Sequence, residues 1–248
     1  MIDFYLIYIL FFVIIFVQSI VGVGVLVIGT PVLLIFGFEF KQVLSMLLPI
    51  SILTSFINLI LMTKTNKKKY LIDLVLVKDF FIICTPSIFI GIYLVKLFED
   101  SINFGIIVGI IILISLTIKL LYEKKFLYHT SKLKNISLIV IGIVHGLSNS
   151  GGSILLLIKG SLKKKRDARF DITYFYFLLA SVQYIIFLYF FEMYLEAKYF
   201  THIIILILLG SGVSNLVIGK INDSIFKNLI NFIIAISSLI LLFKSLIY

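Results

Sequence analysis

The chain has 248 residues, of which 61% are apolar and 14% charged, and its formal net charge is +10. Water-soluble proteins are about 45–50% apolar and about 25% charged, so this composition excludes a soluble domain. It predicts an all-α polytopic protein that crosses the cell membrane (the inner, or plasma, membrane) several times. The basic residues fall in short segments between apolar runs. They are therefore expected to orient the chain in the bilayer and not to bind nucleic acid.

The apolar runs divide the chain into two similar halves. The predicted membrane segments are 4–21, 25–38, 43–62, 74–96, 102–122, 135–147, 153–162, 171–191, 201–219 and 225–247. Asp100-Ser101-Ile102 joins the last two segments of the first half, and Asp223-Ser224-Ile225 joins those of the second. We therefore predict a first transmembrane repeat over 1–123, a basic linker over 124–134, and a second repeat over 135–248.

The first apolar stretch, 4–38, is too long for one membrane helix. As a helix it would extend about 52 Å, against roughly 30 Å of hydrocarbon. Gln18, Gly22 and Gly24 lie near its middle, and glycine lets the chain turn and lets a ligand approach the backbone closely. The stretch therefore either tilts strongly or turns back at Gly22-Val23-Gly24. Close packing of helices is the alternative reason for glycines here.

Segment 43–62 carries a polar stripe. Ser51, Thr54, Ser55 and Asn58 share one helical face, and we predict that this face lines a binding site. Hydroxyl groups that bond to their own helix are the alternative. No Asp or Glu lies in the middle of any predicted segment, so the sequence shows no carboxylate relay of the kind found in proton pumps.

The stretch 135–162 repeats the features of 4–38. His145 takes the place of Gln18 and is followed by Asn149-Ser150-Gly151-Gly152-Ser153. Small polar residues at membrane depth are costly to bury without partners, so these are predicted to line the site. For His145 a hydrogen bond between helices is the alternative. Segment 171–191 carries a thinner polar stripe of Thr173, Ser181 and Gln183.

The placement of Lys and Arg distinguishes two topologies. If 4–38 and 135–162 each cross the membrane once, 12 basic residues lie on one side and 10 on the other. If each is a hairpin that returns, 18 lie on one side and four on the other: Lys41, Lys96, Lys198 and Lys244. The second division obeys the positive-inside rule. It predicts two inverted repeats, each a glycine-notched hairpin plus three transmembrane helices (eight spans in conventional counting), with both termini outside.

The two hairpins resemble the TauE/SafE family of sulfite exporters. That family repeats a pattern close to G-x-x-x-G-x-x-G-x-G-G-G followed by P-x-L in both halves. The matching residues are Gly22, Gly24, Pro31 and Leu33 in the first half, and Gly142, Gly146, Gly151 and Gly152 in the second. Val25, Leu26, Asn149 and Ile158 depart from the pattern. The resemblance implies a permease or exporter of a small organic or inorganic anion, often sulfur-containing such as sulfite or an organosulfonate.

The expected function is therefore secondary transport of a small anion, without cofactor or metal and without enzymatic activity. The expected binding site is formed by Gln18, Gly22, Gly24, His145, the run Asn149 to Ser153, and the stripe Ser51, Thr54, Ser55 and Asn58. Gly151→Leu is predicted to abolish transport. Two alternatives stay open: a membrane subunit or assembly factor that transports nothing, and a transporter of cations or neutral solutes. The expected partners are the anion and the lipid bilayer, and a homo-oligomer is compatible with the sequence.

Overall fold

The computed structural model describes residues 4–65, 70, 72–98, 104–121, 133–162, 165–191 and 197–247. Every secondary-structure element in these residues is a helix, which confirms the all-α prediction. Most of the predicted linker 124–134 and the tripeptide Asp100-Ser101-Ile102 lie outside the described residues. Five described helices are long and apolar enough to cross a membrane.

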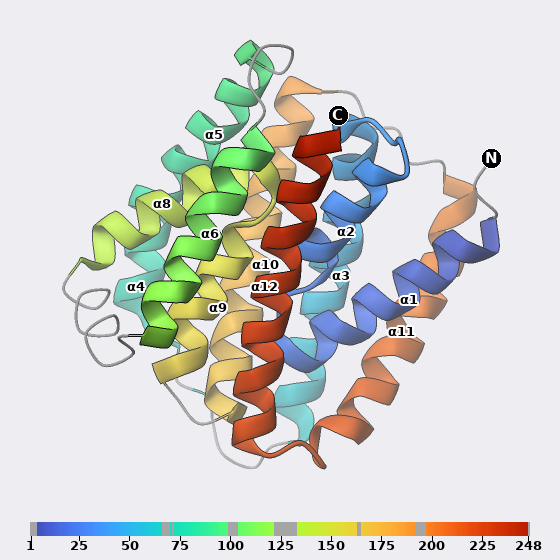
Figure 1. Cartoon of the computed structure of the whole chain (residues 1–248). Helices are drawn as coiled ribbons and strands as arrows, with labels where there is room; N and C mark the ends of the chain where they lie inside the picture. Colours follow the sequence, from blue (N-terminus) through green and yellow to red (C-terminus); the bar gives the residue numbers. More distant parts are fainter. Residues whose placement is uncertain are drawn as a thin grey trace.

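Figure 1 labels the helices in their order along the chain. In the first half they are α1 (Phe4–Val21), α2 (Val25–Ile35), α3 (Phe40–Thr65), α4 (Leu74–Asp79), the π-helical turn η1 (Phe80–Cys84), α5 (Thr85–Phe98) and α6 (Phe104–Leu121). In the second half they are α8 (Lys134–Ser148), α9 (Gly151–Leu162), α10 (Lys165–Phe190), α11 (Ala197–Ile218) and α12 (Asp223–Ile247).

Both long apolar stretches are broken at the predicted places. Gly22, with φ 96°, ends α1 and donates its N–H to the carbonyl of Gln18 at 2.7 Å. Asn149, with φ 62°, ends α8 and donates to the carbonyl of His145 at 2.9 Å. Glycine and, less readily, asparagine tolerate this left-handed conformation, which stops a helix and redirects the chain. As a result α2 packs back on α1, and α9 packs back on α8.

The irregular turn η1 has a local cause. It lies within the long helical segment Leu74–Phe98, which begins where the Asp73 carboxylate accepts the N–H of Leu76 at 3.0 Å. Pro86 follows η1 and has no N–H to offer the carbonyl of Ile82, four residues earlier. A proline inside a helix interrupts its hydrogen-bond ladder, and a wider turn is one way to accommodate it.

Uncharged polar side chains lie inside the molecule beside an apolar core, and many large apolar side chains also face outward. The exposed fraction of Gln18, His145 and Gln183 is at most 1%, whereas that of Leu216 is 77% and that of Phe243 is 65%. An apolar exterior of this kind is stable in lipid and would associate in water. The distribution therefore agrees with a multi-pass membrane protein.

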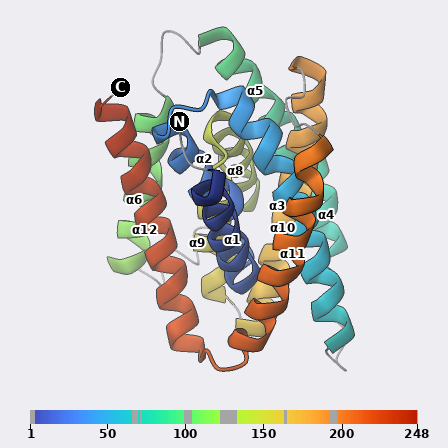
Figure 2. The ribbon, with the colours of Figure 1, turned by 90° about the vertical axis from the view of Figure 1, so that its right-hand side faces the viewer.

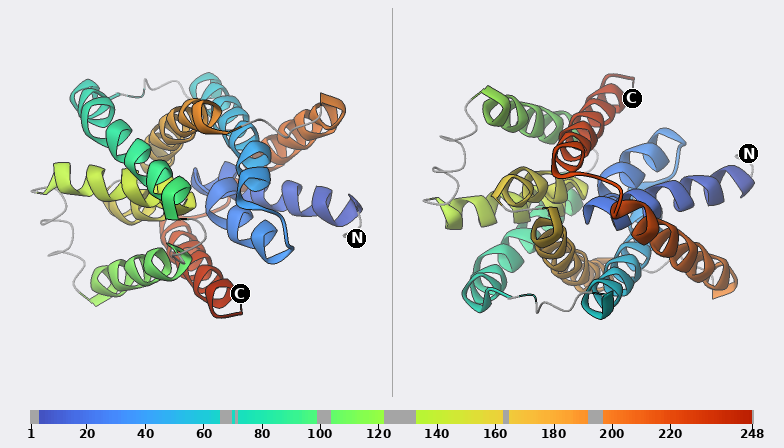
Figure 3. Two further views of the ribbon diagram at one scale, coloured as in Figure 1. Left: turned by 90° about the horizontal axis from the view of Figure 1, so that it is seen from above. Right: turned by 90° about the horizontal axis from the view of Figure 1, so that it is seen from below.

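Helices from the two halves pack against one another. α3 lies against α10, α6 against α12, α1 against α11, and α5 against α8 (Figures 1 and 2). In Figure 1, α3 runs down from the end at which the C-terminus lies, whereas α10 runs up toward it. Figure 3 looks along the bundle and shows α1 and α8 entering it from opposite sides. The hairpins meet in the middle, where α2 contacts α9.

Basic residues mark the two ends of the molecule. Lys41 and Lys96 both lie over aromatic rings at the C-terminal end of α10, 5.5 and 5.0 Å from the ring centroids. At the other end of α10, Arg166 lies 4.9 Å from the ring centroid of Tyr70. Lys165 donates there to backbone carbonyls at the joint between α11 and α12. Lys41 and Lys96, from the smaller predicted charge group, therefore lie at one end of α10, and Lys165 and Arg166, from the larger one, lie at the other.

Candidate functional site

Gln18 joins the first hairpin to the long helix α3. Its side-chain amide donates to the carbonyl of Ser51 at 2.9 Å and to the hydroxyl of Ser55 at 3.0 Å. Its side-chain oxygen accepts the N–H of Val25, the first residue of α2, at 2.9 Å. The first N–H groups of a helix have no partner within it. Gln18 therefore caps the start of α2 from within the same hairpin and fixes it to the polar stripe of α3.

The C-terminal part of the polar stripe on α3 binds the end of α1. Asn58 donates to the hydroxyl of Ser19 at 2.9 Å and to its own helix at the carbonyl of Thr54 at 2.8 Å. The Ser19 hydroxyl also lies 3.2 Å from that of Ser211 on α11. The stripe thus faces the first hairpin and bonds to it as well as to its own helix, and its role in lining a binding site stays a prediction.

Gln183 plays the corresponding part for the second hairpin. Its amide on α10 donates to the side-chain oxygen of Asn149 at 2.5 Å and to the carbonyl of His145 at 3.2 Å. Asn149 in turn donates to the hydroxyl of Thr30 on α2 at 2.8 Å. One asparagine at the second break therefore links α10, α8 and the first hairpin. Sequence reasoning placed Gln183 on a polar stripe but did not single out Thr30.

Tyr176 lies between the two hairpins. Its hydroxyl accepts the N–H of Leu26, the second residue of α2, at 3.1 Å. Its ring centroid lies 6.2 Å from that of His145 on α8, and a Cβ at Gly152 would lie 2.7 Å from the ring. The chain contains 13 tyrosines, and nothing in the pattern around Tyr176 distinguishes it. Its position at the centre follows from the packing of α10 against the two hairpins and from its hydrogen bond to Leu26.

Several buried polar atoms near the breaks have no hydrogen-bond partner among the described residues. They are both ring nitrogens of His145, the side-chain oxygen of Gln183, the hydroxyl of Thr54 and the side-chain oxygen of Asn58. Unpaired buried polar atoms are rare in native proteins because each loses its hydration. Water or a ligand with both donors and acceptors would satisfy this set.

The glycines and serines of the breaks pack against the protein itself. A Cβ at Gly151 would lie 2.4 Å from the carbonyl oxygen of Ile141, and one at Gly24 would lie 2.8 Å from the backbone nitrogen of Gln18. Ser153 shares a 3.2 Å hydrogen bond with Ser237 on α12. Gly151→Leu would therefore separate α9 from α8, and loss of transport in that variant would not identify a binding residue.

Arg169 is a buried cation beside the first hairpin. It lies in the second turn of α10 with 6% of its surface exposed. Its guanidinium donates to the carbonyl of Ser19 at the end of α1 and to the side-chain oxygen of Asn215 at 3.1 Å. Lys and Arg suit the last turn of a helix, where carbonyl groups carry partial negative charge. The charge count assigned this arginine to the more basic side of the membrane and did not predict its burial.

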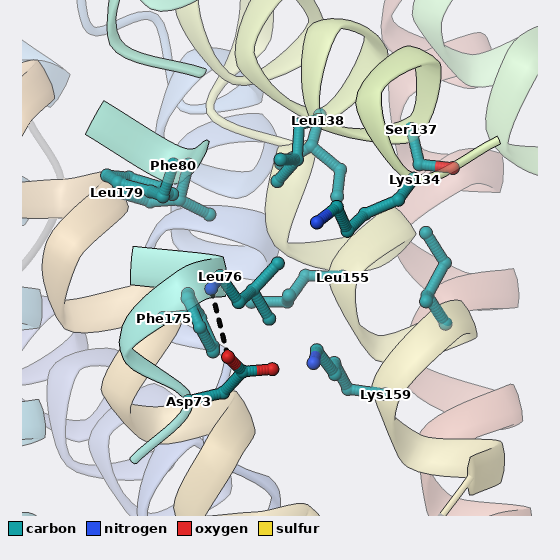
Figure 4. Close-up of a pocket in the computed structure, with 12 residues that line it drawn as sticks. Asp73, Leu76, Phe80, Lys134, Ser137, Leu138, Leu155, Lys159, Phe175 and Leu179 are labelled. Atoms are coloured by element: carbon teal, nitrogen blue, oxygen red, sulfur yellow. Dashed lines mark hydrogen bonds between the residues drawn. The ribbon is translucent and has the colours of Figure 1, made fainter. Parts of the chain in front are cut away.

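A separate cavity of about 230 Å³ lies between α4, α8, α9 and α10. Figure 4 shows that Lys134, Lys159 and Asp73 converge on it from three of these helical segments. In the part of the chain that the structure describes, no group of His, Cys, Asp and Glu is arranged to hold a metal ion.

Comparison with known proteins gives one match. No curated protein and no solved structure matches the chain. The sequence model of the family described as "Sulfite exporter TauE/SafE" matches residues 7–241, which is nearly the whole chain and includes both hairpins. That family consists of membrane transporters. With its two broken apolar hairpins and its lipid-facing exterior, the chain belongs to the sulfite exporter TauE/SafE family.

Proposed function

We propose that the protein is a secondary transporter of a small anion, and that the anion binds where the two hairpins break. The observation that carries this proposal is that two buried groups at the breaks that can donate a hydrogen bond, the ring of His145 and the hydroxyl of Thr54, have no partner among the described residues. Broken helices at membrane depth occur where they line a cavity or are buried in protein, and in transporters they mark substrate sites.

The electrostatics of the breaks favour an anion over a cation. Among the described residues the buried polar and charged side chains include Arg169 but no Asp or Glu. The N-terminus of α2 also points its N–H groups into the break, and helix N-termini carry partial positive charge. In this structure the side-chain oxygens of Gln18 and Tyr176 accept hydrogen bonds from the first two of these N–H groups. The oxygens of an anion would take the same positions.

The transport cycle that we propose uses two inverted repeats, 1–123 and 135–248, which rock against each other around the hairpins. Pairing of equivalent helices supports this: α3 with α10, and α6 with α12. The basic end would face the cytoplasm and both termini the outside. An inside-negative potential then favours export of an anion by about 2.3 kcal/mol per charge per 100 mV, so no coupling carboxylate is required. The family points to sulfite or an organosulfonate as cargo.

The test is transport by the purified protein in liposomes. Labelled sulfite, thiosulfate and a sulfonate are supplied in turn under an imposed membrane potential. We expect uptake of at least one of them to follow the potential. If none of the three anions is taken up and a partner protein copurifies in stoichiometric amount, the result would favour a membrane subunit that does not transport.

A matched pair of variants on α3 tests the site itself. Thr54→Val removes a hydroxyl that has no partner, so the fold loses no hydrogen bond while a bound anion loses a donor. We expect the KM for the transported anion to rise about tenfold, the usual effect of one hydrogen bond to a charged group. Thr63→Val is the control, because Thr63 is exposed and bonds only to its own helix. An unchanged KM in Thr54→Val would place the anion away from this hydroxyl.

A further inference from the structure

Arg169 carries a buried positive charge with which no carboxylate of the described residues forms an ion pair. Its Nε donates to the carbonyl of Ser19 at 3.0 Å, and its Nη2 donates to the same carbonyl and to the side-chain oxygen of Asn215. Both acceptors are neutral, and the end of α1 offers only the partial negative charge of a helix C-terminus. A buried charge normally has a partner of opposite charge, because its loss of hydration is costly.

The guanidinium of Arg169 also has donors to spare. Nε and Nη2 use their N–H groups on Ser19 and Asn215, whereas the N–H groups of Nη1 have no partner among the described residues. A guanidinium presents its donors as a planar fork that fits two oxygens of one anion. Arg169 can therefore accept an anion before it gives up either of its present acceptors.

Arg169 lies on the face of α10 that follows the hairpin breaks. The hydroxyl of Thr173, one turn further along, would lie 2.9 Å from a Cβ at Gly22 in the first break. Tyr176 bonds to the start of α2, and Gln183 bonds at the second break. Arg169 precedes Tyr176 by two turns, about 10 Å along the helix, so an anion that enters from the basic end would meet Arg169 first.

Ser19 connects Arg169 to the proposed site at the breaks. Its carbonyl accepts from Arg169, and its hydroxyl accepts from the amide of Asn58 on α3 at 2.9 Å. The side-chain oxygen of Asn58 and the hydroxyl of Thr54 are buried without partners among the described residues. A single residue therefore separates the guanidinium from an unpaired donor of that site.

We infer that Arg169 binds the transported anion on the basic side of the first break, by exchanging the Ser19 carbonyl and Asn215 for the oxygens of the anion. The inference rests on the proposed transport function and names the charged residue that serves it. A guanidinium bonds more strongly to an anion than to a neutral oxygen, which drives the exchange. The bond to Ser19 joins the two halves of the chain, so its release also frees the end of α1 from α10.

Asn215→Asp tests the inference by supplying a fixed counter-charge. The carboxylate would form an ion pair with Arg169 where the Asn215 oxygen already lies 3.1 Å from Nη2. Binding of sulfite, thiosulfate and methanesulfonate to the detergent-purified full-length protein is measured as a rise in its thermal unfolding midpoint. We expect binding to weaken about tenfold or more, while the midpoint without ligand shows that the variant folds.

Asn222→Asp is the matched control for this variant. Asn222 is exposed at the same basic end and caps α12 through its side-chain oxygen, a role that aspartate also fills. The control therefore adds the same charge without giving Arg169 a partner. If Arg169 only holds helices together, both variants bind the anions as tightly as the wild type, and that result would overturn the inference.

Two variants of Arg169 separate its charge from its hydrogen bonds. Lysine and glutamine can both donate to the Ser19 carbonyl, but only lysine keeps the charge. Arg169→Lys should bind the anions more weakly than the wild type, because it loses the fork. Arg169→Gln should bind them about tenfold more weakly still. Equal affinities of these two variants would contradict a role for the charge.

Liposome flux separates this inference from the transport function on which it rests. If anion flux follows the potential and is equal in Asn215→Asp and Asn222→Asp, the assignment of Arg169 fails and the transporter stands. If Asn215→Asp loses binding but no anion moves through the wild type, the proposed function fails and Arg169 holds an anion for another purpose. Stabilisation of the wild type by chloride alone, or by no anion, would overturn the inference, since any occupant would then be a resident counter-ion.

Discussion

Two side chains at the breaks accept hydrogen bonds from the first N–H groups of α2, which would otherwise be open to a ligand. Gln18 accepts the N–H of Val25, and Tyr176 accepts that of Leu26. These two N–H groups begin α2, where an incoming anion would find the most favourable backbone donors. The side-chain oxygens satisfy the donors while the site holds no anion, which avoids the cost of leaving them unpaired. An anion bound at the proposed site would compete with them.

Tyr176→Phe tests this competition. Removal of the hydroxyl frees the N–H of Leu26, so we expect the KM for the transported anion to fall severalfold. The variant should also lose about 1 kcal/mol of stability, because the N–H is left without a partner in the empty protein. Initial rates of uptake into liposomes measure the first effect, and thermal unfolding in detergent measures the second.

Tyr189→Phe provides the matched control, since the Tyr189 side chain is 81% exposed and lies at the far end of α10. A raised KM in Tyr176→Phe, with Tyr189→Phe unchanged, would mean that the Tyr176 hydroxyl contacts the anion directly and does not compete with it.

At the scale of helices, small residues set how closely the second hairpin approaches its neighbour. α8 crosses α5 at Gly142, Gly146 and Gly91. A Cβ at Gly146 would lie 2.4 Å from the carbonyl oxygen of Ile88, and one at Gly91 would lie 2.6 Å from that of Ile143. Membrane helices gain little from the hydrophobic effect and depend on such close backbone contacts. The contact joins a hairpin of one half to a helix of the other.

Gly146→Ala should therefore destabilise the protein. The added methyl group meets backbone atoms that cannot move independently, and overpacking of this kind costs about 1–3 kcal/mol. Gly212→Ala on α11 is the matched control, because nothing lies within 4 Å of the position that its methyl group would take. That variant should be neutral or more stable, since alanine favours a helix over glycine. Equal unfolding midpoints for the two variants in detergent would contradict the close crossing of α5 and α8.

At the scale of the whole molecule, the two ends of α10 differ in basic residues and predict the orientation in the membrane. Lys41 lies at one end, and Lys220 at the other, where it follows α11. Lys41→Cys should react in intact cells with a maleimide that cannot cross the membrane. Lys220→Cys should react only after the cells are permeabilised. The native Cys84 is buried and should give little background.

The opposite labelling pattern would reverse the proposed orientation. Reaction of both cysteines in intact cells would mean that α3 and the joint between α11 and α12 reach the same side. The proposed inverted arrangement of the two halves would then be wrong.

The local features of this protein follow from its sequence. The predicted helix segments and both breaks agree with the structure because membrane helices depend on apolar length, and breaks depend on residues such as Gly22 and Asn149 that tolerate a left-handed backbone. Helical periodicity alone puts Ser51, Ser55 and Asn58 on one face of α3, and in the structure all three bond to residues of α1.

Contacts between distant parts of the chain were decided only by the tertiary structure. Leu26 and Tyr176 are separated by 150 residues in sequence and share a hydrogen bond at the centre of the molecule. Arg169 is buried against α1 although the charge count assigned it to the more basic side of the membrane, and Gly151 packs against the carbonyl of Ile141 on α8, a contact that the sequence did not indicate. Sequence periodicity specifies which face of a helix is polar or small, but not which helix covers that face. The packing of the two hairpins between α3 and α10 makes that choice.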